Sequence, residues 1–216
     1  MSFSELAGQL AAAGKGFYER GWVLGTSGNF SAVAGREPLR VAITESAAAK
    51  GSLTPDQILE IDGDGAVLRP AGARPSAETL LHLAIYRNRT AGAVLHTHSI
   101  HGTMMSDRAA ADGGFVIHGY EMLKGLAGID THEHREWIPV LENSQNMREL
   151  AAEVETLLAE KPSLRAFLIR RHGLYTWGRD LAEATRHVEI LEFLMEVLWR
   201  SSESRMSNAP FTAPGR

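Results

Sequence analysis

The stretch AGAVLHTHSIHG, residues 91–102, places three histidines directly after a short apolar run. An apolar run of this length that ends in polar residues is typical of a buried strand. Because positions i and i+2 of a strand project to the same face, His96 and His98 can converge on one ion while Thr97 points to the other side. His101 would fall on the opposite face of a continuing strand, so we interpret it as the opening of the next helix. The stretch therefore predicts a strand that ends in two convergent imidazoles.

The patterns outside this strand predict a mixed α/β chain. Helical spacing is present at 4–20, from Pro75-Ser76 onward with Ser76 as N-cap, at 146–161 and at 180–201, and a short helix is expected within 54–62. Strands are expected at 39–44, 115–119, 137–142 and 165–178, with a hairpin at 63–70. The connections resemble hairpins rather than strict βαβ alternation, and no GxGxxG follows a first strand. We therefore predict an αβα sandwich with a central, largely antiparallel sheet.

Length and composition limit the kind of protein. A chain of 216 residues suits one domain, which we place at 1–200, followed by a polar tail at 201–216 that we expect to be flexible. The net charge of -4 offers no basic field for a nucleic-acid backbone or an anionic membrane. We expect a small-molecule partner, with neither nucleic acid nor membrane.

The absence of cysteine excludes disulfides and thiolate ligands and leaves His, Asp and Glu as the strong metal ligands. The segment MSFSELAGQL has no basic n-region, and no apolar run approaches the roughly 20 residues of a membrane span. We expect a cytoplasmic protein.

An open zinc site normally has three protein ligands, so a third must join His96 and His98. One candidate is His172 in RRHGLYTWG, at the polar end of an apolar strand and followed by a glycine. The pair His132 and His134 competes with it, but its charged surroundings favour a solvated loop. Two further histidines, His82 and His187, lie within amphipathic helices and are expected at the surface or its boundary.

Several stretches in order resemble the class II aldolase/adducin family. They are GTSGNFS at 25–31, Ile43-Thr44 with Ser46, RPSAE at 74–78, HTH at 96–98 and RRHG at 170–173. The resemblance covers about residues 20–200. It implies an αβα sandwich around an antiparallel sheet and a homotetramer with sites near subunit interfaces. It also implies one zinc ion (Zn2+) per subunit, held by His96, His98 and His172.

The segment Gly25, Thr26, Ser27, Gly28 and Asn29 can turn backbone N–H groups and two hydroxyls inward as a nest for a phosphate dianion. The resemblance implies that this loop, Ser46 and Ser76 hold the phosphate of a sugar-phosphate substrate. The chain departs from the aldolases of the family at Ala47 and Ala77, where they tend to carry Gly and a second Ser. Nearby Lys50 is a charge partner at long range, although a lysine in a loop is usually solvated.

Two carboxylates compete for the proton-transfer role. Glu78 matches the metal-binding glutamate of the aldolases, but a glutamate in a first helical turn also favours the helix dipole. Glu121 lies in HGYEMLKG at 118–125, which together with IPVLEN at 138–143 resembles a dehydratase branch of the family. That branch implies a zinc-dependent carbon–oxygen lyase working through a metal-stabilised enediolate, with Glu121 as the acid/base and Glu78 in a secondary role. The alternatives are a ketose-phosphate aldolase or epimerase, and a non-catalytic adducin-like interaction domain.

Overall fold

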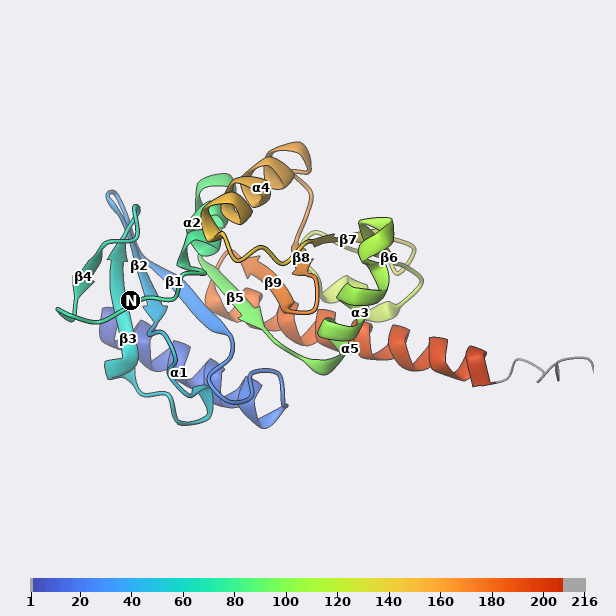
Figure 1. Ribbon diagram of the computed structural model, residues 1–216, viewed down its shortest axis with the longest axis horizontal. Helices are drawn as coiled ribbons and strands as arrows, with labels where there is room; N and C mark the ends of the chain where they lie inside the picture. Colours follow the sequence, from blue (N-terminus) through green and yellow to red (C-terminus); the bar gives the residue numbers. More distant parts are fainter. Residues whose placement is uncertain (1, 208–216) are drawn as a thin grey trace, which may run out of the picture.

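A nine-stranded sheet forms the middle layer of the protein, in the order β4-β3-β2-β1-β5-β9-β8-β7-β6 (Figure 1). The computed structural model describes residues 2–207. Neighbouring strands are antiparallel except for the parallel pair β7–β8. The strands are β1 (Asn29–Arg36), β2 (Leu39–Thr44), β3 (Ile58–Asp62), β4 (Val67–Arg69), β5 (Ala93–Thr97), β6 (Gly114–Ile117), β7 (Glu136–Leu141), β8 (Ala166–Ile169) and β9 (Gly173–Gly178). The predicted sandwich with a largely antiparallel sheet is confirmed.

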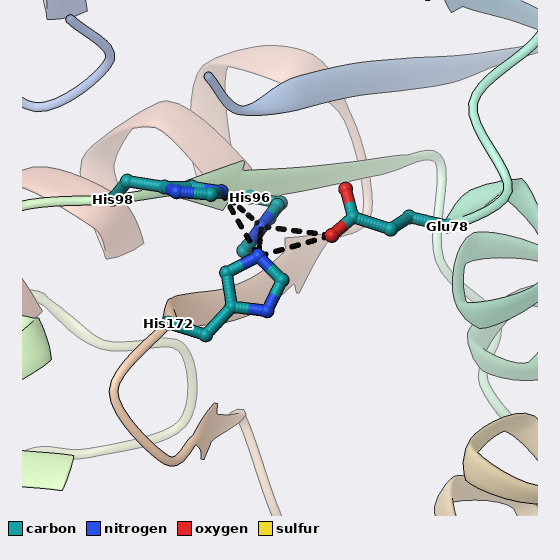
Figure 2. A group of neighbouring side chains, drawn as sticks. All are labelled: Glu78, His96, His98 and His172. Carbon is teal, nitrogen blue, oxygen red and sulfur yellow. Dashed lines mark hydrogen bonds and ion pairs between the residues drawn. The ribbon is translucent and has the colours of Figure 1, made fainter. Parts of the chain in front are cut away.

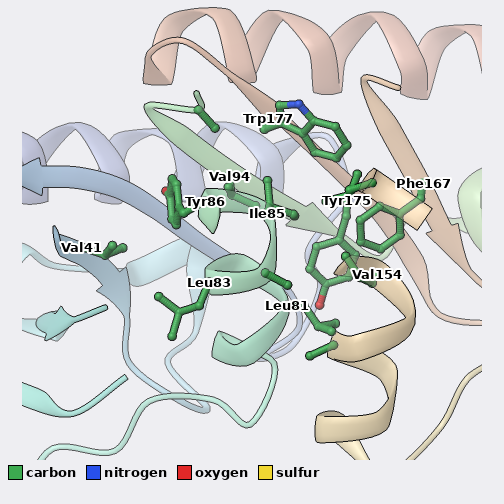
Figure 3. Close-up of a cluster of buried hydrophobic side chains, with 14 of the residues drawn as sticks. Val41, Leu81, Leu83, Ile85, Tyr86, Val94, Val154, Phe167, Tyr175 and Trp177 are labelled. Atoms are coloured by element: carbon green, nitrogen blue, oxygen red, sulfur yellow. The ribbon is translucent and has the colours of Figure 1, made fainter. Parts of the chain in front are cut away.

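Helices cover both faces of the sheet, as Figure 1 shows. They are α1 (Phe3–Glu19), α2 (Thr79–Asn88), α3 (Ile100–Ala109), α4 (Met147–Glu160) and α5 (Leu181–Ser207), with 3₁₀ turns η1 (Lys50–Ser52), η2 (Pro55–Gln57), η3 (Ala110–Asp112) and η4 (Glu121–Gly125). Side chains alternate along β2, so that Val41 and Ile43 join the core under α2 and α4, whereas Ala42 joins the core under α1 and α5. Figure 3 shows the first of these cores, in which Phe167 and Tyr175 stack.

The same alternation orients the side chains of β5. On β5, Val94 packs into the core under α2 and α4, and Leu95 packs into the core under α1 and α5. His96 therefore faces the α2 side and Thr97 the α5 side, where its hydroxyl donates to Glu192 over 2.5 Å. His101 lies in the first turn of α3, as predicted.

Two local predictions are corrected. The expected short helix within 54–62 is confined to η2, because Ile58–Asp62 forms strand β3 and pairs with β2. Ser76 does not cap α2: the helix begins at Thr79, and Glu78 is the N-cap residue. The reason is a tight turn in which the N–H of Glu78 donates to the Ser76 hydroxyl over 3.2 Å and the N–H of Thr79 to the Ser76 carbonyl over 3.0 Å.

Helix α5 continues through Ser207, so the predicted domain boundary at residue 200 falls inside a helix. The remaining tail, residues 208–216, lies outside the described residues. Among residues 2–207, no helix has both the length and the apolar character required to cross a membrane.

Candidate metal and phosphate site

Four side chains from three parts of the chain converge at one point beside the sheet (Figure 2). His96 comes from the end of β5, His98 from the residue after Thr97, His172 from the turn between β8 and β9, and Glu78 from the start of α2. The His98 Nε2 lies 2.8 Å from His96 Nε2 and 3.2 Å from His172 Nε2, and the His96–His172 separation is 3.3 Å. The Glu78 Oε1 lies 3.0 Å from His172 Nε2 and 3.8 Å from His96 Nε2.

This arrangement fits a divalent metal ion. Ligand atoms about 2.0–2.1 Å from a tetrahedral zinc ion lie roughly 3.3 Å from one another, close to the observed nitrogen separations. The other ring nitrogen of His96, Nδ1, donates to the Leu174 carbonyl over 2.9 Å, which leaves the Nε2 lone pair directed into the cluster. Residues His96, His98, His172 and Glu78 are therefore able to hold a metal ion.

Burial keeps the His96 and His98 imidazoles in the neutral form that ligates metal. It lowers the pKa of His98 to about 4 and that of His96 well below its usual value. Burial alone would raise the pKa of Glu78, but the hydrogen bonds with His172 and with the Asn29 amide help to outweigh it, and the pKa is lowered. At neutral pH the cluster thus offers neutral His96 and His98 rings and an ionised Glu78 carboxylate, the protonation states that metal binding needs.

A buried hydrogen-bond chain holds Glu78 in place. The Asn29 amide donates to Glu78 Oε2, and its carbonyl oxygen accepts from His82 Nε2. The other His82 nitrogen, Nδ1, must then accept from the Ser31 hydroxyl over 2.7 Å, while Ser31 in turn accepts from the Tyr86 hydroxyl over 2.8 Å. Burial lowers the pKa of His82 to about 4, so the ring stays neutral as this chain requires. Asn29 is therefore oriented from behind by groups that never touch the cluster.

The surface or boundary position predicted for His82 and His187 is wrong, because both are buried. His187 donates from Nδ1 to the Trp177 carbonyl over 2.7 Å and accepts from the Ala127 N–H over 3.0 Å. Both rings are held as structural hydrogen-bond partners.

We expect Ser31→Ala to lower the free energy of unfolding by about 1–3 kcal/mol, because it leaves buried polar groups of His82 and Tyr86 without their partner. Thr156→Ala is the matched control, since that exposed helical hydroxyl bonds only the carbonyl of Ala152. The control should change stability by less than about 0.5 kcal/mol. Urea unfolding of both variants makes the comparison, and equal losses would contradict the network.

A cleft of about 530 Å³ opens beside the cluster. Six of the predicted phosphate-site residues line it together with Glu78, His98 and His172, namely Thr26, Ser27, Gly28, Asn29, Ser46 and Ser76. The seventh, Gly25, is not part of the lining and turns the chain at φ 62°. Ser27 uses its N–H and its hydroxyl on the Leu24 carbonyl, at 3.2 and 2.7 Å.

Backbone strain concentrates on this cleft. Within the described part of the chain, the non-glycine residues with positive φ are Ala47 at 59° and Arg171 at 53°, and both line the cleft. Gly28 combines a φ of 73° with a close approach, since a Cβ there would lie 2.7 Å from the His96 carbonyl oxygen. Such positions are tolerated where the surrounding structure holds them for function.

The sequence did not indicate five further cleft residues, which are Asn143, Gln145, Met147, Arg171 and Glu45. The first three follow β7, where a polar segment after a strand gives no specific signal. Arg171 directly precedes the predicted ligand His172 in RRHG, and this position next to a ligand is the sequence feature that could have indicated it.

Glu121 lies apart from the cluster in its own chain. Its side chain is 72% exposed and pairs with Lys124, and its carboxylate is 3.8 Å from His132 Nδ1. His134 pairs with Glu136 instead, at 2.7 Å. The competing histidines therefore do not form a metal site with each other among residues 2–207.

The fold and the site together define a candidate metal-dependent enzyme. The chain belongs to the class II aldolase and adducin family, because the sequence model of the Class II Aldolase and Adducin N-terminal domain matches residues 8–199. It is 43% identical to methylthioribulose-1-phosphate dehydratase of Sorangium cellulosum (strain So ce56), over 90% of this chain and 92% of that one. It is also 45% identical to the methylthioribulose-1-phosphate dehydratase of Methylococcus capsulatus, over 90% of this chain and 93% of the relative. Among solved structures, YgbL from Escherichia coli is 25% identical, with a TM-score of 0.77 over 91% of this chain and 89% of that chain.

Proposed function

We propose that the protein is a methylthioribulose-1-phosphate dehydratase, a carbon–oxygen lyase of methionine salvage. The observation that carries this proposal is the convergence of three imidazoles and Glu78 on a cleft with a polar loop, in a chain 43–45% identical to enzymes with that name. The substrate is 5-methylthioribulose 1-phosphate, and the product is 2,3-diketo-5-methylthiopentyl 1-phosphate. The reaction removes the C3 proton and the C4 hydroxyl as one water, followed by tautomerisation of the enol to the diketone.

Zinc is the proposed metal, one per subunit, with His96, His98 and His172 as ligands. Tetrahedral spacing and an all-imidazole set suit this ion. When bound, it polarises the C2 carbonyl and the C3 hydroxyl of the substrate and makes the C3 proton easier to remove.

Residues of the chain bind the substrate phosphate and transfer the protons. The loop at 25–29, with Ser46 and Ser76, binds the phosphate and fixes the sugar chain relative to the cluster. Glu78, held by Asn29, acts as an outer-shell group or as a ligand that the substrate displaces. Glu121 protonates the departing C4 hydroxyl and shuttles the C3 proton.

The position of Glu121 supports a role in a neighbouring subunit. In the single chain, the hydrogen bond from Lys124 lowers the pKa of Glu121, the opposite of what a general acid requires. Adjacent Met122 leaves 40% of its surface exposed, which is an apolar surface that a second copy could cover. Docking against the cleft of another subunit would bury Glu121 and raise its pKa. We accordingly propose a cytoplasmic homotetramer in which Glu121 completes the site of a neighbour. Each subunit is proposed to be one domain, whose last helix, α5, extends past residue 200.

Metal analysis tests the ligand set. Protein purified with zinc should contain one ion per chain by inductively coupled plasma mass spectrometry. A chelator should remove both the ion and the activity, and added zinc should restore both. Full turnover by metal-free protein would contradict the proposal.

The second candidate function is a ketose-phosphate aldolase or epimerase, which the placement of Glu78 favours. In the cluster Glu78 occupies the position of a metal-adjacent proton carrier, 3.0 Å from His172. An aldolase would release a triose phosphate from L-fuculose or L-rhamnulose 1-phosphate, and an epimerase would invert a ribulose phosphate. Nuclear magnetic resonance of the reaction mixtures separates these products from the diketone. The adducin-like interaction domain predicts degraded ligands, whereas this chain keeps all three imidazoles and both glutamates.

A further inference from the structure

Lys50 differs from the other three lysines of the chain. Lys15, Lys124 and Lys161 are exposed, whereas Lys50 is only 1% exposed. The expectation of a solvated loop lysine is therefore wrong, because Lys50 begins η1 and its side chain runs inward between two loops. Its ammonium donates to the Thr26 carbonyl over 3.2 Å and to the Ala48 carbonyl over 2.7 Å.

These two carbonyls belong to the loops that carry the proposed phosphate contacts. Thr26 lies in the segment 25–29, and Ala48 follows Ser46 and Ala47, both of which line the cleft. Lys50 itself is not part of that lining, so it lies behind the cleft wall and connects the two loops. An ammonium has three N–H donors, and in the described structure two of them are used.

The charge of Lys50 has no carboxylate partner within 4.0 Å among the residues whose side chains the structure describes. Burial of an unpaired cation has an unfavourable desolvation free energy, and an anion that binds close by offsets it. Burial indeed lowers the pKa of Lys50 to about 8, with the charge of Glu78 acting in the opposite direction. At neutral pH the ammonium remains charged.

We propose that Lys50 is the counter-charge of the substrate phosphate, acting from behind the two loops that hold it. The loops supply neutral N–H and hydroxyl donors, and Lys50 supplies the positive charge that selects a dianion over a neutral group. This inference rests on the proposed sugar-phosphate function and deepens it. Lysine suits the role because its compact charge fits at the end of a buried apolar stem.

The test uses the metal-loaded full-length protein and inorganic phosphate as the probe. Lys50→Gln keeps N–H donors for the carbonyls without the charge, and Lys50→Met removes both. Both variants should bind phosphate at least tenfold more weakly by isothermal titration calorimetry, with metal content unchanged. Lys15→Gln, an exposed lysine in α1, should bind phosphate as the unmodified protein does.

Phosphate binding by Lys50→Gln at the unmodified affinity would overturn the proposal, since hydrogen bonding and not charge would then matter. If both variants fail to fold, the unmodified protein is tested instead. Its lysines are labelled with carbon-13 at Cε and followed by nuclear magnetic resonance. Of the four lysine signals, that of Lys50 should shift on phosphate titration while the other three stay. An unmoved Lys50 signal, or no phosphate binding at all, would overturn it. Because none of these readouts is a dehydratase assay, they stay informative if the proposed reaction is wrong.

Discussion

Replacing Glu121 by glutamine should lower turnover by about 10²–10⁴-fold while leaving the metal content at one ion per chain, because the amide cannot give or take the proton. The measurement is steady-state turnover of 5-methylthioribulose 1-phosphate together with metal analysis. Glu133→Gln is the matched control, an exposed glutamate in the segment between η4 and β7. Full turnover by the Glu121 variant would exclude it as the acid/base and leave Glu78 as the candidate.

The same variant tests whether Glu121 acts across a subunit boundary. Glu121→Gln and His96→Ala should each be inactive alone, but after mixing and subunit exchange some sites combine an intact cluster with an intact Glu121. If equal amounts of the two variants assort at random, about a quarter of the sites should take the cluster from a Glu121→Gln subunit and Glu121 from a His96→Ala subunit. These sites should be active. Absence of any recovered activity, with exchange shown by native mass spectrometry, would contradict the shared site.

His96→Ala should reduce metal affinity by on the order of a hundredfold or more, with loss of activity. It removes a ligand that is completely buried and oriented by the Leu174 carbonyl. His101→Ala is the matched control, because His101 lies five positions along in the same stretch but in α3, with Glu196 at 3.9 Å. Competition with a chromogenic chelator gives both affinities. Equal affinities would contradict the assignment of His96 as a ligand.

The sequence predicts the core of the cluster well because short-range geometry decides it. The period of two along a strand places His96 and His98 together, and the end of a second apolar strand followed by Gly173 places His172 within reach. The hairpin signals likewise predict the antiparallel sheet that brings β5 beside β9. The resemblance to the family supplies Glu78, which the structure adds to the three imidazoles.

The sequence does not predict which polar side chains the tertiary packing buries. The helix α2 looks amphipathic by itself, but its residue His82 is buried against the sheet, where it contacts Ser31 of β1 and Tyr175 of β9. Lys50 is enclosed by its own loop and by a loop 24 positions earlier in the chain, and its ammonium donates to the Ala48 carbonyl of the first and to the Thr26 carbonyl of the second. The role of Glu121 is beyond any single-chain pattern, since the proposed partner surface belongs to another copy.

Mass spectrometry of the reaction products distinguishes a dehydratase from an aldolase. Metal-loaded protein is incubated with 5-methylthioribulose 1-phosphate, and with L-fuculose and L-rhamnulose 1-phosphates in parallel. The proposed dehydratase should remove one water from the first substrate and leave the other two unchanged. A triose phosphate with an aldehyde from either deoxy sugar would contradict it, and would identify Glu78 as the principal proton carrier.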